Sequence, residues 1–229
     1  CLYEHCMDYF DLGSNWISLP APNIKPGVKY QEPEVCHQIF QHTANFIKCG
    51  KDIFYSLPGD IDKNKGKGTS SGIHWFKRHL PMFDFNAVNI GGHVDGKIAL
   101  LRPGLLATWN KNWIPAQLSL WDAIEIPDNA NFPDDFVKTK KKRYYGEYVK
   151  KYLENWIGYA DESVFDVNVL SVDPQRVIVT GNDPKILRLF ENKGLTPIFW
   201  NFRHQYFWDG GIHCVTADMV RDGEAETYC

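Results

Sequence analysis

The segment from residue 165 to residue 202 constrains the fold most, because four secondary-structure signals follow one another within it. Two runs rich in Val, Leu and Ile, separated by the Asp173-Pro174 turn, predict two strands. A run with helical spacing follows, Gly194 ends it, and a third apolar run follows the glycine. The predicted elements are strands over 165–172 and 177–180, a helix over 184–193 and a strand over 196–202. This order defines one ββαβ unit.

Parts of the same order recur upstream. An apolar segment around Gly50 ends in a strand that starts at Asp52, and a helix with Ser70 or Ser71 as N-cap precedes another strand. The ranges predicted upstream are a helix and strand over 1–24, an apolar segment over 44–54, a helix over 72–80 and strands over 85–90, 98–101 and 105–109. This internal repetition predicts an α/β array of modules around a centre, treated as a single domain over 1–229.

Composition excludes several classes of protein. Hydrophobic residues make up 44% and charged residues 23%, which is typical of a globular chain. No apolar run approaches the length of a membrane span, so we expect no membrane partner. With 25 Lys and Arg against 28 Asp and Glu we expect no nucleic-acid partner. The basic cluster at 138–143 is interpreted as a solvated helix start.

The six cysteines form no disulfide framework. They are unevenly spaced and contain no C-x-x-C pair, so reduced thiols, buried in most cases, are predicted, and no zinc site. Reduced thiols favour a cytoplasmic location.

Two glycine-flanked motifs depart from the strand and helix patterns. In GGHVDG (residues 91–96), His93 and Asp95 are two residues apart, which in a strand places both side chains on one face. In GGIHCVT (residues 210–216), two glycines precede His213 and Cys214. A cysteine with a distant histidine and carboxylate is typical of enzymes with a thiol nucleophile. A buried cysteine beside two turn glycines is the alternative.

These motifs, together with others in the same order, resemble the arginine-dependent amidinotransferases. These are the glycine and inosamine amidinotransferases of the guanidine-modifying (pentein) superfamily. The resembling blocks span most of the chain: Trp16 to Pro22, Ala44 to Phe54, His93-Val-Asp95, Pro103-Gly104, Asn168-Val-Leu, Asp173, Arg176-Val, Gly210-Gly, His213-Cys214, Thr216 and Asp218.

The resemblance implies a pentein-type α/β propeller of five ββαβ modules with the active site in its central channel, here without the N-terminal module or modules. It implies that the Cys214 thiolate attacks the guanidinium carbon of arginine or a related guanidine. Ornithine then leaves, and an amine acceptor takes the amidino group from the cysteine. Asp95 would orient the guanidinium and His93 would act as general acid and base. No metal or organic cofactor is implied, and the whole protein could form a homodimer.

Further candidate substrate contacts are His42, Asn45, Lys111, Asp166 and His213. Asp166 and Asp218 are two further carboxylates that could orient the guanidinium, but for both we favour a structural role. His42 stands where the family has the acid that partners the catalytic histidine, and an imidazole cannot stabilise an imidazolium as a carboxylate does. Lys111 is the candidate substitute for an arginine that the family uses to bind the substrate carboxylate. These departures, and the family's longer N-terminal part, leave open two alternatives, a guanidine hydrolase and a non-catalytic relative that keeps the fold.

Overall fold

The computed structural model describes residues 43–56, 70–90, 93–127, 130–131, 161–162, 166–202, 211–216 and 228. These residues form two compact units. Unit 1 contains the described residues before Gly92, and unit 2 contains those from His93 onward. The elements predicted over 1–24, most of the charged segment after Pro127, His42 and Asp218 lie outside the described residues.

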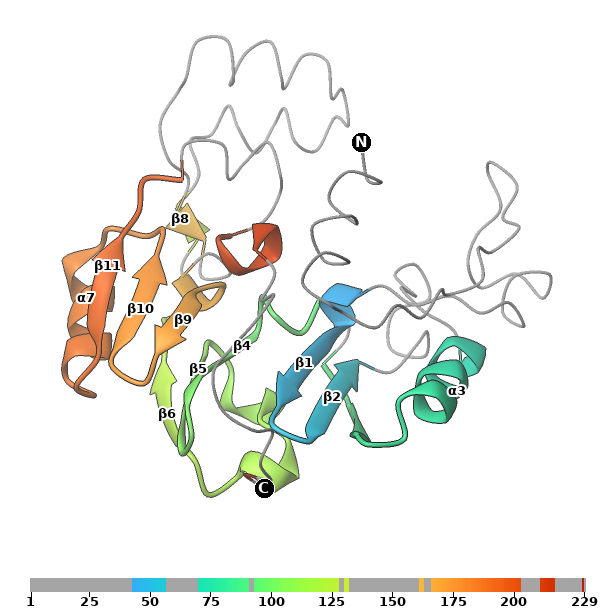
Figure 1. Ribbon diagram of the computed structural model, residues 1–229. Helices are drawn as coiled ribbons and strands as arrows, with labels where there is room; N and C mark the ends of the chain where they lie inside the picture. The colour runs from blue at the N-terminus through green and yellow to red at the C-terminus, as the bar shows by residue number, and fades with distance from the viewer. Residues whose placement is uncertain are drawn as a thin grey trace, which may run out of the picture. The chain divides into compact units, whose positions relative to one another are not determined.

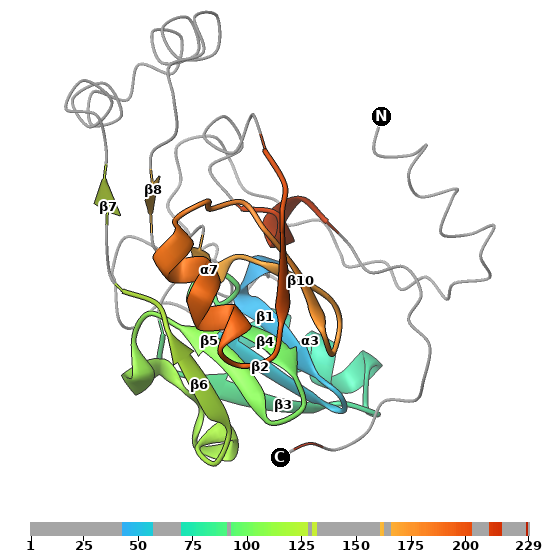
Figure 2. The ribbon, with the colours of Figure 1, turned by 90° about the vertical axis from the view of Figure 1, so that its left-hand side faces the viewer.

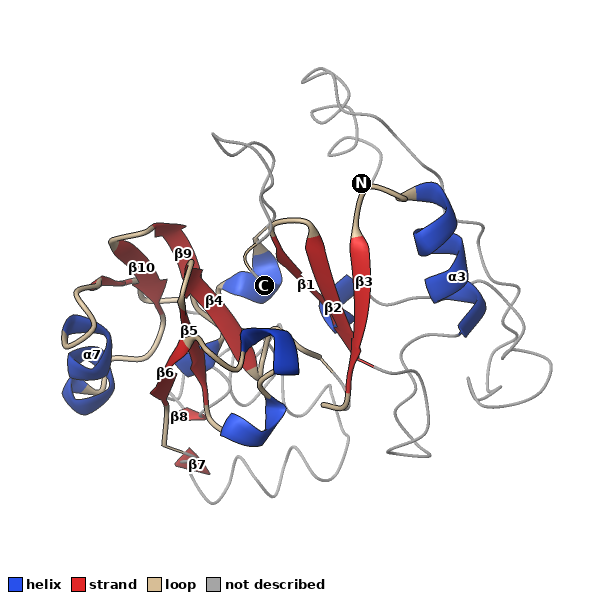
Figure 3. Cartoon of the chain, turned by 90° about the horizontal axis from the view of Figure 1, so that it is seen from below, coloured by secondary structure: helices blue, strands red, loops and turns tan. Residues whose placement is uncertain are grey.

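Unit 1 is one ββαβ module. A short 3-10 helix, η1, leads into a hairpin that turns at Gly50, whose φ of 59° lies in the left-handed region. The second hairpin strand pairs in parallel with the strand that follows the helix. Figure 3 shows this helix, α3, beside the strands of its unit. The elements are η1 (Thr43–Asn45), β1 (Phe46–Cys49), β2 (Asp52–Ser56), α3 (Ser70–His79) and β3 (Asp84–Val88).

Unit 2 contains two sheets with the same topology (Figure 1). In each, two strands form an antiparallel hairpin and a crossover brings a third strand parallel to the second. The first sheet contains β4 (Ile98–Arg102), β5 (Leu105–Thr108) and β6 (Asp122–Glu125), and its crossover holds the 3-10 helices η2 (Lys111–Trp113) and η3 (Ala116–Leu118). The second contains β9 (Leu170–Asp173), β10 (Arg176–Val179), α7 (Pro184–Glu191) and β11 (Thr196–Phe199). The rest are the pair β7 (Ala130–Asn131) and β8 (Asp161–Glu162), and the 3-10 helix η5 (His213–Val215).

The predicted ββαβ order of residues 165–202 is confirmed, and the described chain contains the same topology three times. Two local predictions were wrong. The strand predicted over 165–172 begins only at Leu170, because residues 166–167 form a helical turn. Helix α3 begins at Ser70, so the two serines are inside the helix and do not precede it. His93 and Asp95 precede β4 and lie outside the strands, so the shared face that a strand would give them does not apply.

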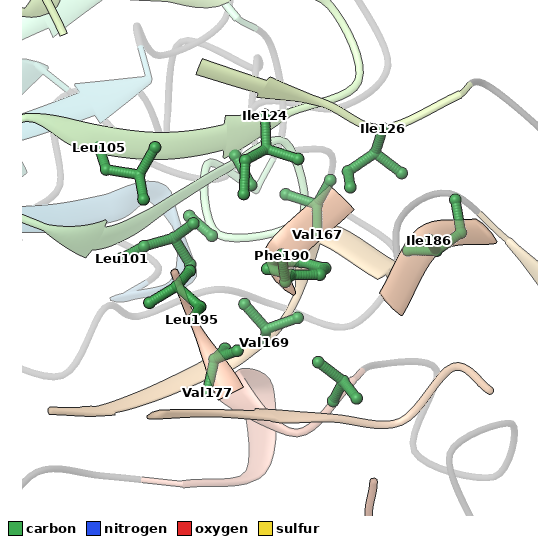
Figure 4. Close-up of a cluster of buried hydrophobic side chains, with 13 residues drawn as sticks. Leu101, Leu105, Ile124, Ile126, Val167, Val169, Val177, Ile186, Phe190 and Leu195 are labelled. Atoms are coloured by element: carbon green, nitrogen blue, oxygen red, sulfur yellow. The ribbon is translucent and has the colours of Figure 1, made fainter. Parts of the chain in front are cut away.

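The two modules of unit 2 share one hydrophobic core. Figure 4 shows its side chains meeting between the two sheets and α7, and Figure 2 shows α7 lying against the sheet of its own module. Phe190 from α7 and Val177 from β10 are fully buried in it. Burial of this apolar surface is the main force that holds the two modules together.

Hydrogen bonds fix the two sheets of unit 2 in register. The Ser171 hydroxyl donates to the Leu101 carbonyl at 2.5 Å, so β9 lies against β4. Arg102 donates to the carbonyls of Pro174 at 3.1 Å and Lys193 at 2.7 Å. Since β4 and β9 are adjacent, the segments that precede them, 93–97 and 166–169, come together as well.

No helix in the described parts of the chain is long and apolar enough to cross a membrane.

Candidate functional site

The turn that carries Asp95 is held by the end of β5. The Thr108 hydroxyl donates to the Lys97 carbonyl at 2.8 Å, and the Trp109 indole donates to the Gly96 carbonyl at 3.0 Å. Inside the turn, Val94 is fully buried and its carbonyl accepts from the amides of Lys97 at 2.9 Å and Ile98 at 3.0 Å. The turn is therefore anchored on both sides of Asp95, and its carboxylate has little freedom to move.

The Asp95 carboxylate lies between two proton donors. The residue is only 5% exposed, and Oδ2 accepts from Cys214 Sγ at 3.1 Å and from His213 Nδ1 at 3.3 Å. The other oxygen, Oδ1, is buried and has no hydrogen-bond partner among the described residues. A buried carboxylate oxygen without a donor is costly in free energy, and such an oxygen is suited to accept from a ligand N–H.

Cys214 lies in η5, where the Asn168 side chain contacts it twice. Asn168 Oδ1 accepts from the Cys214 amide at 3.1 Å, and Nδ2 donates to Cys214 Sγ at 3.2 Å. The same Nδ2 donates to the Asp95 carbonyl at 3.1 Å. Asn168 therefore links the cysteine to the turn that carries the carboxylate.

Gly211 makes this approach possible. A Cβ on Gly211 would lie 2.6 Å from Asn168 Oδ1, 2.7 Å from its Cβ and 2.8 Å from its carbonyl oxygen. A side-chain Cβ does not approach other atoms this closely, so Asn168 would have to move if Gly211 were any other residue. One of the two glycines that stand out in the sequence is thus needed for close packing against Asn168.

The charges at the site keep Asp95 ionised and Cys214 protonated. Burial by itself raises the pKa of Asp95, but hydrogen bonds from His213 and Cys214 and the charges that His213 and His93 can carry hold that pKa below its usual value. Cys214 is exposed as a residue, but its thiol is partly withdrawn from solvent against Asn168 and Asp95. This desolvation and the negative charge of Asp95 raise the pKa of Cys214 to about 12. The cysteine is therefore a thiol that donates to Asp95, and a cation beside Asp95 would lower its pKa.

The other predicted site residues have different positions. His93 is close enough to Asp95 for its charge to act on the carboxylate. Lys111 is in η2 and pairs with Glu125 at 2.8 Å. Asp166 precedes Asn168 and packs against Gly181. Asn45 is buried in unit 1. The structure thus brings together Cys214, Asp95, His213 and His93 out of the predicted set, while His42 lies outside the described residues.

Sequence reasoning did not assign a role at the site to Asn168. The only sequence feature that pointed to Asn168 is the Asn168-Val-Leu block, which is one of the blocks that resemble the amidinotransferases. Among the described residues, no group of three or more His, Cys, Asp and Glu side chains could hold a metal ion.

Known proteins of similar sequence are amidinotransferases. The mitochondrial glycine amidinotransferase of Gallus gallus is 26% identical over 96% of this chain and 52% of its own length. The L-arginine:L-lysine amidinotransferase of Pseudomonas savastanoi pv. phaseolicola is 26% identical over 96% of this chain and 59% of its own length. The chain thus spans between half and three fifths of the length of these relatives. No protein-family model matches it.

Solved structures show the same fold. The inosamine-phosphate amidinotransferase of Streptomyces griseus superposes with a TM-score of 0.71 at 23% identity, over 98% of this chain and 61% of the other. An amidinotransferase of the saxitoxin pathway from Microseira wollei gives 0.72 at 22% identity, over all of this chain and 64% of the other. The described chain is therefore an α/β protein with the amidinotransferase fold.

Amidinotransferases are its homologues along almost its whole length, which confirms the resemblance predicted from the motifs.

Proposed function

We propose that this chain carries the thiol site of an amidinotransferase that takes an amidino group from arginine or a related guanidine and passes it to an amine. The observation that carries the proposal is the Cys214 Sγ–Asp95 Oδ2 contact of 3.1 Å, made by a buried carboxylate whose second oxygen, Oδ1, is also buried and has no hydrogen-bond partner among the described residues. A guanidinium offers N–H groups in a planar fork, which matches a carboxylate.

Binding of the guanidinium at Asp95 activates the thiol. The cation neutralises the charge that holds the pKa of Cys214 high and competes with the thiol for Asp95. The thiolate can then form in the presence of the substrate. In the free protein the thiolate is scarce at neutral pH, because desolvation and the charge of Asp95 hold the pKa of Cys214 far above its usual value.

The transfer proceeds in two steps that balance in atoms and charge. Cys214 Sγ bonds to the guanidinium carbon, the bond from that carbon to the donor's alkyl nitrogen breaks, and the thiol proton goes to the departing amine by way of His93. The enzyme then holds a cationic amidino-cysteine. The acceptor amine attacks its carbon, the C–S bond breaks, and the proton lost by the amine returns to the thiol. The position of His93 beside Asp95 supports this role.

The test uses arginine labelled with ¹³C at the guanidino carbon. We expect a labelled amidino group on the Cys214 peptide in mass spectra, and ornithine whose release increases when glycine or lysine is added as acceptor. Cys214→Ser should give neither. Citrulline in place of transferred product would instead establish the hydrolase alternative. Arginine that binds with no adduct and no product would contradict the proposal and favour the non-catalytic relative.

A further inference from the structure

We infer that Asn168 is the positioning residue of the thiol: its side-chain amide fixes the Cys214 backbone and supplies a hydrogen bond to the sulfur when the thiolate forms. The inference rests on the proposed function for its chemical meaning, but the contacts stand independently of it.

Both ends of the Asn168 amide are engaged at the cysteine. Oδ1 accepts from the Cys214 amide at 3.1 Å, and Nδ2 lies 3.2 Å from Sγ. In addition, the Asn168 carbonyl accepts from the His213 amide at 3.4 Å. Asn168 thereby receives two consecutive amides of η5, which fixes the direction in which the cysteine side chain points.

Burial gives these contacts their strength. Asn168 is 1% exposed, and Gly211 packs against its side chain and backbone with no room for a Cβ. The amide cannot rotate away without leaving buried polar atoms unpaired. It therefore stays in place while the proton on sulfur leaves.

Nδ2 and Asp95 act on the sulfur in opposite directions. The Asp95 carboxylate accepts the thiol proton and favours the protonated form, whereas the Nδ2–H group is a donor and favours the anion. When a guanidinium occupies Asp95, the opposing charge is neutralised and the donor from Asn168 remains. The other titratable groups at this position are His213 and His93, which contact or act on Asp95.

The test measures alkylation of Cys214 by iodoacetamide from pH 8 to pH 11, followed by mass spectrometry of the Cys214 peptide in the whole protein. Asn168→Leu removes the donor and the acceptor, and Asn168→Asp keeps the shape and the acceptor but replaces the donor by a carboxylate. We expect both variants to react about tenfold more slowly than the wild type at the alkaline end of the range, because the thiolate loses a charge-assisted hydrogen bond.

Asn112→Asp is the matched control, because it adds the same charge at an exposed position in η2. Its alkylation rate should stay within about twofold of the wild-type rate. A residue that only fills space would give the opposite result, since loosening the site exposes the thiol and speeds alkylation. Faster or unchanged alkylation in Asn168→Asp overturns the inference. If Asn168→Leu does not fold, the result for Asn168→Asp alone is the test.

Failure of the inference differs from failure of the proposed function. Alkylation requires no turnover, so a protein that forms no amidino adduct still reports on Asn168. If transfer does occur, Asn168→Asp should lower kcat for arginine more than it raises KM, because the Asn168 side chain contacts the nucleophile and not the Asp95 carboxylate.

Discussion

Two buried aspartates, Asp52 in unit 1 and Asp95 in unit 2, differ in whether their hydrogen-bond partners can transfer a proton. They are 7% and 5% exposed, so burial does not separate them. Asp52 Oδ1 accepts from the side-chain amide of Asn86 at 2.8 Å, and an amide does not give up its proton. Asp95 instead accepts from a thiol and lies beside an imidazole, two groups whose protons can be transferred, and its Oδ1 has no hydrogen-bond partner among the described residues. The chemistry of a buried carboxylate thus depends on whether the proton of its partner can leave.

The substitution of each aspartate by asparagine tests this contrast most strongly. In Asp95→Asn, formation of the amidino adduct should fall about 100-fold or more, because the buried charge that receives the guanidinium is lost. Alkylation of Cys214 at pH 8 should rise at least about tenfold in the same variant, since the charge that raises the pKa of the thiol is gone. Labelled arginine and iodoacetamide, each followed by mass spectrometry, measure the two changes.

Asp52→Asn is the control for this pair of measurements. It should leave alkylation of Cys214 unchanged and lower the free energy of unfolding by about 1–2 kcal/mol through the altered pairing with Asn86. If adduct formation and alkylation fell together in Asp95→Asn, the carboxylate would be a structural support only, like Asp52.

Two glycines provide the next test. In Gly211→Ala the added methyl group collides with Asn168, so we expect a loss of about 1–3 kcal/mol in stability and a changed alkylation rate at Cys214. In Gly194→Ala nothing lies within 4 Å of the new Cβ, but φ is 73°, so the cost is about 1 kcal/mol of backbone strain. Thermal unfolding and alkylation measure both effects. Equal alkylation rates in the two variants would mean that Gly211 does not control the position of the thiol.

The smallest expected effect comes from the support of the Asp95 turn. Thr108 is fully buried, and its hydroxyl lies 2.8 Å from the Lys97 carbonyl and 3.1 Å from that of Asn110. Thr108→Val keeps the shape and removes the donor, so about 1 kcal/mol of stability should be lost, with a change in Cys214 alkylation of less than about threefold. If Thr108→Val changed the alkylation rate of Cys214 more than Asp95→Asn does, the geometry of the turn, and not the charge of Asp95, would be the main determinant of thiol reactivity.

Much of the fold could be predicted from the sequence, because strands and helices have different apolar periods. The ββαβ order after residue 165 follows from that periodicity and from Gly194. The start of the segment was mistaken for a strand because Val167 and Val169 are β-branched, whereas Asn168 between them uses its side chain to bind η5. Periodicity carries no signal for such a tertiary contact.

The candidate site was predictable in its residue types but not in its hydrogen bonds. The resemblance selected Cys214, Asp95 and His93, while the spacing of His93 and Asp95 says nothing of the contacts that hold their segment in place. The roles of Asn168 and His213 depend on contacts between segments more than 40 residues apart, as the sequence separations of 46 and 118 residues show. A single sequence does not contain those pairings.

The hydrogen bond that the Cys214 thiol donates to Asp95 has a consequence for the chemical durability of the protein. Cys214 is exposed, and an exposed cysteine with an ordinary thiolate population is open to peroxide and to electrophiles. Oxidation begins at the thiolate, and the raised pKa of Cys214 keeps the thiolate scarce. Under the proposed function, Asp95 would thus slow oxidation of the sulfur, and a bound guanidinium would remove that protection.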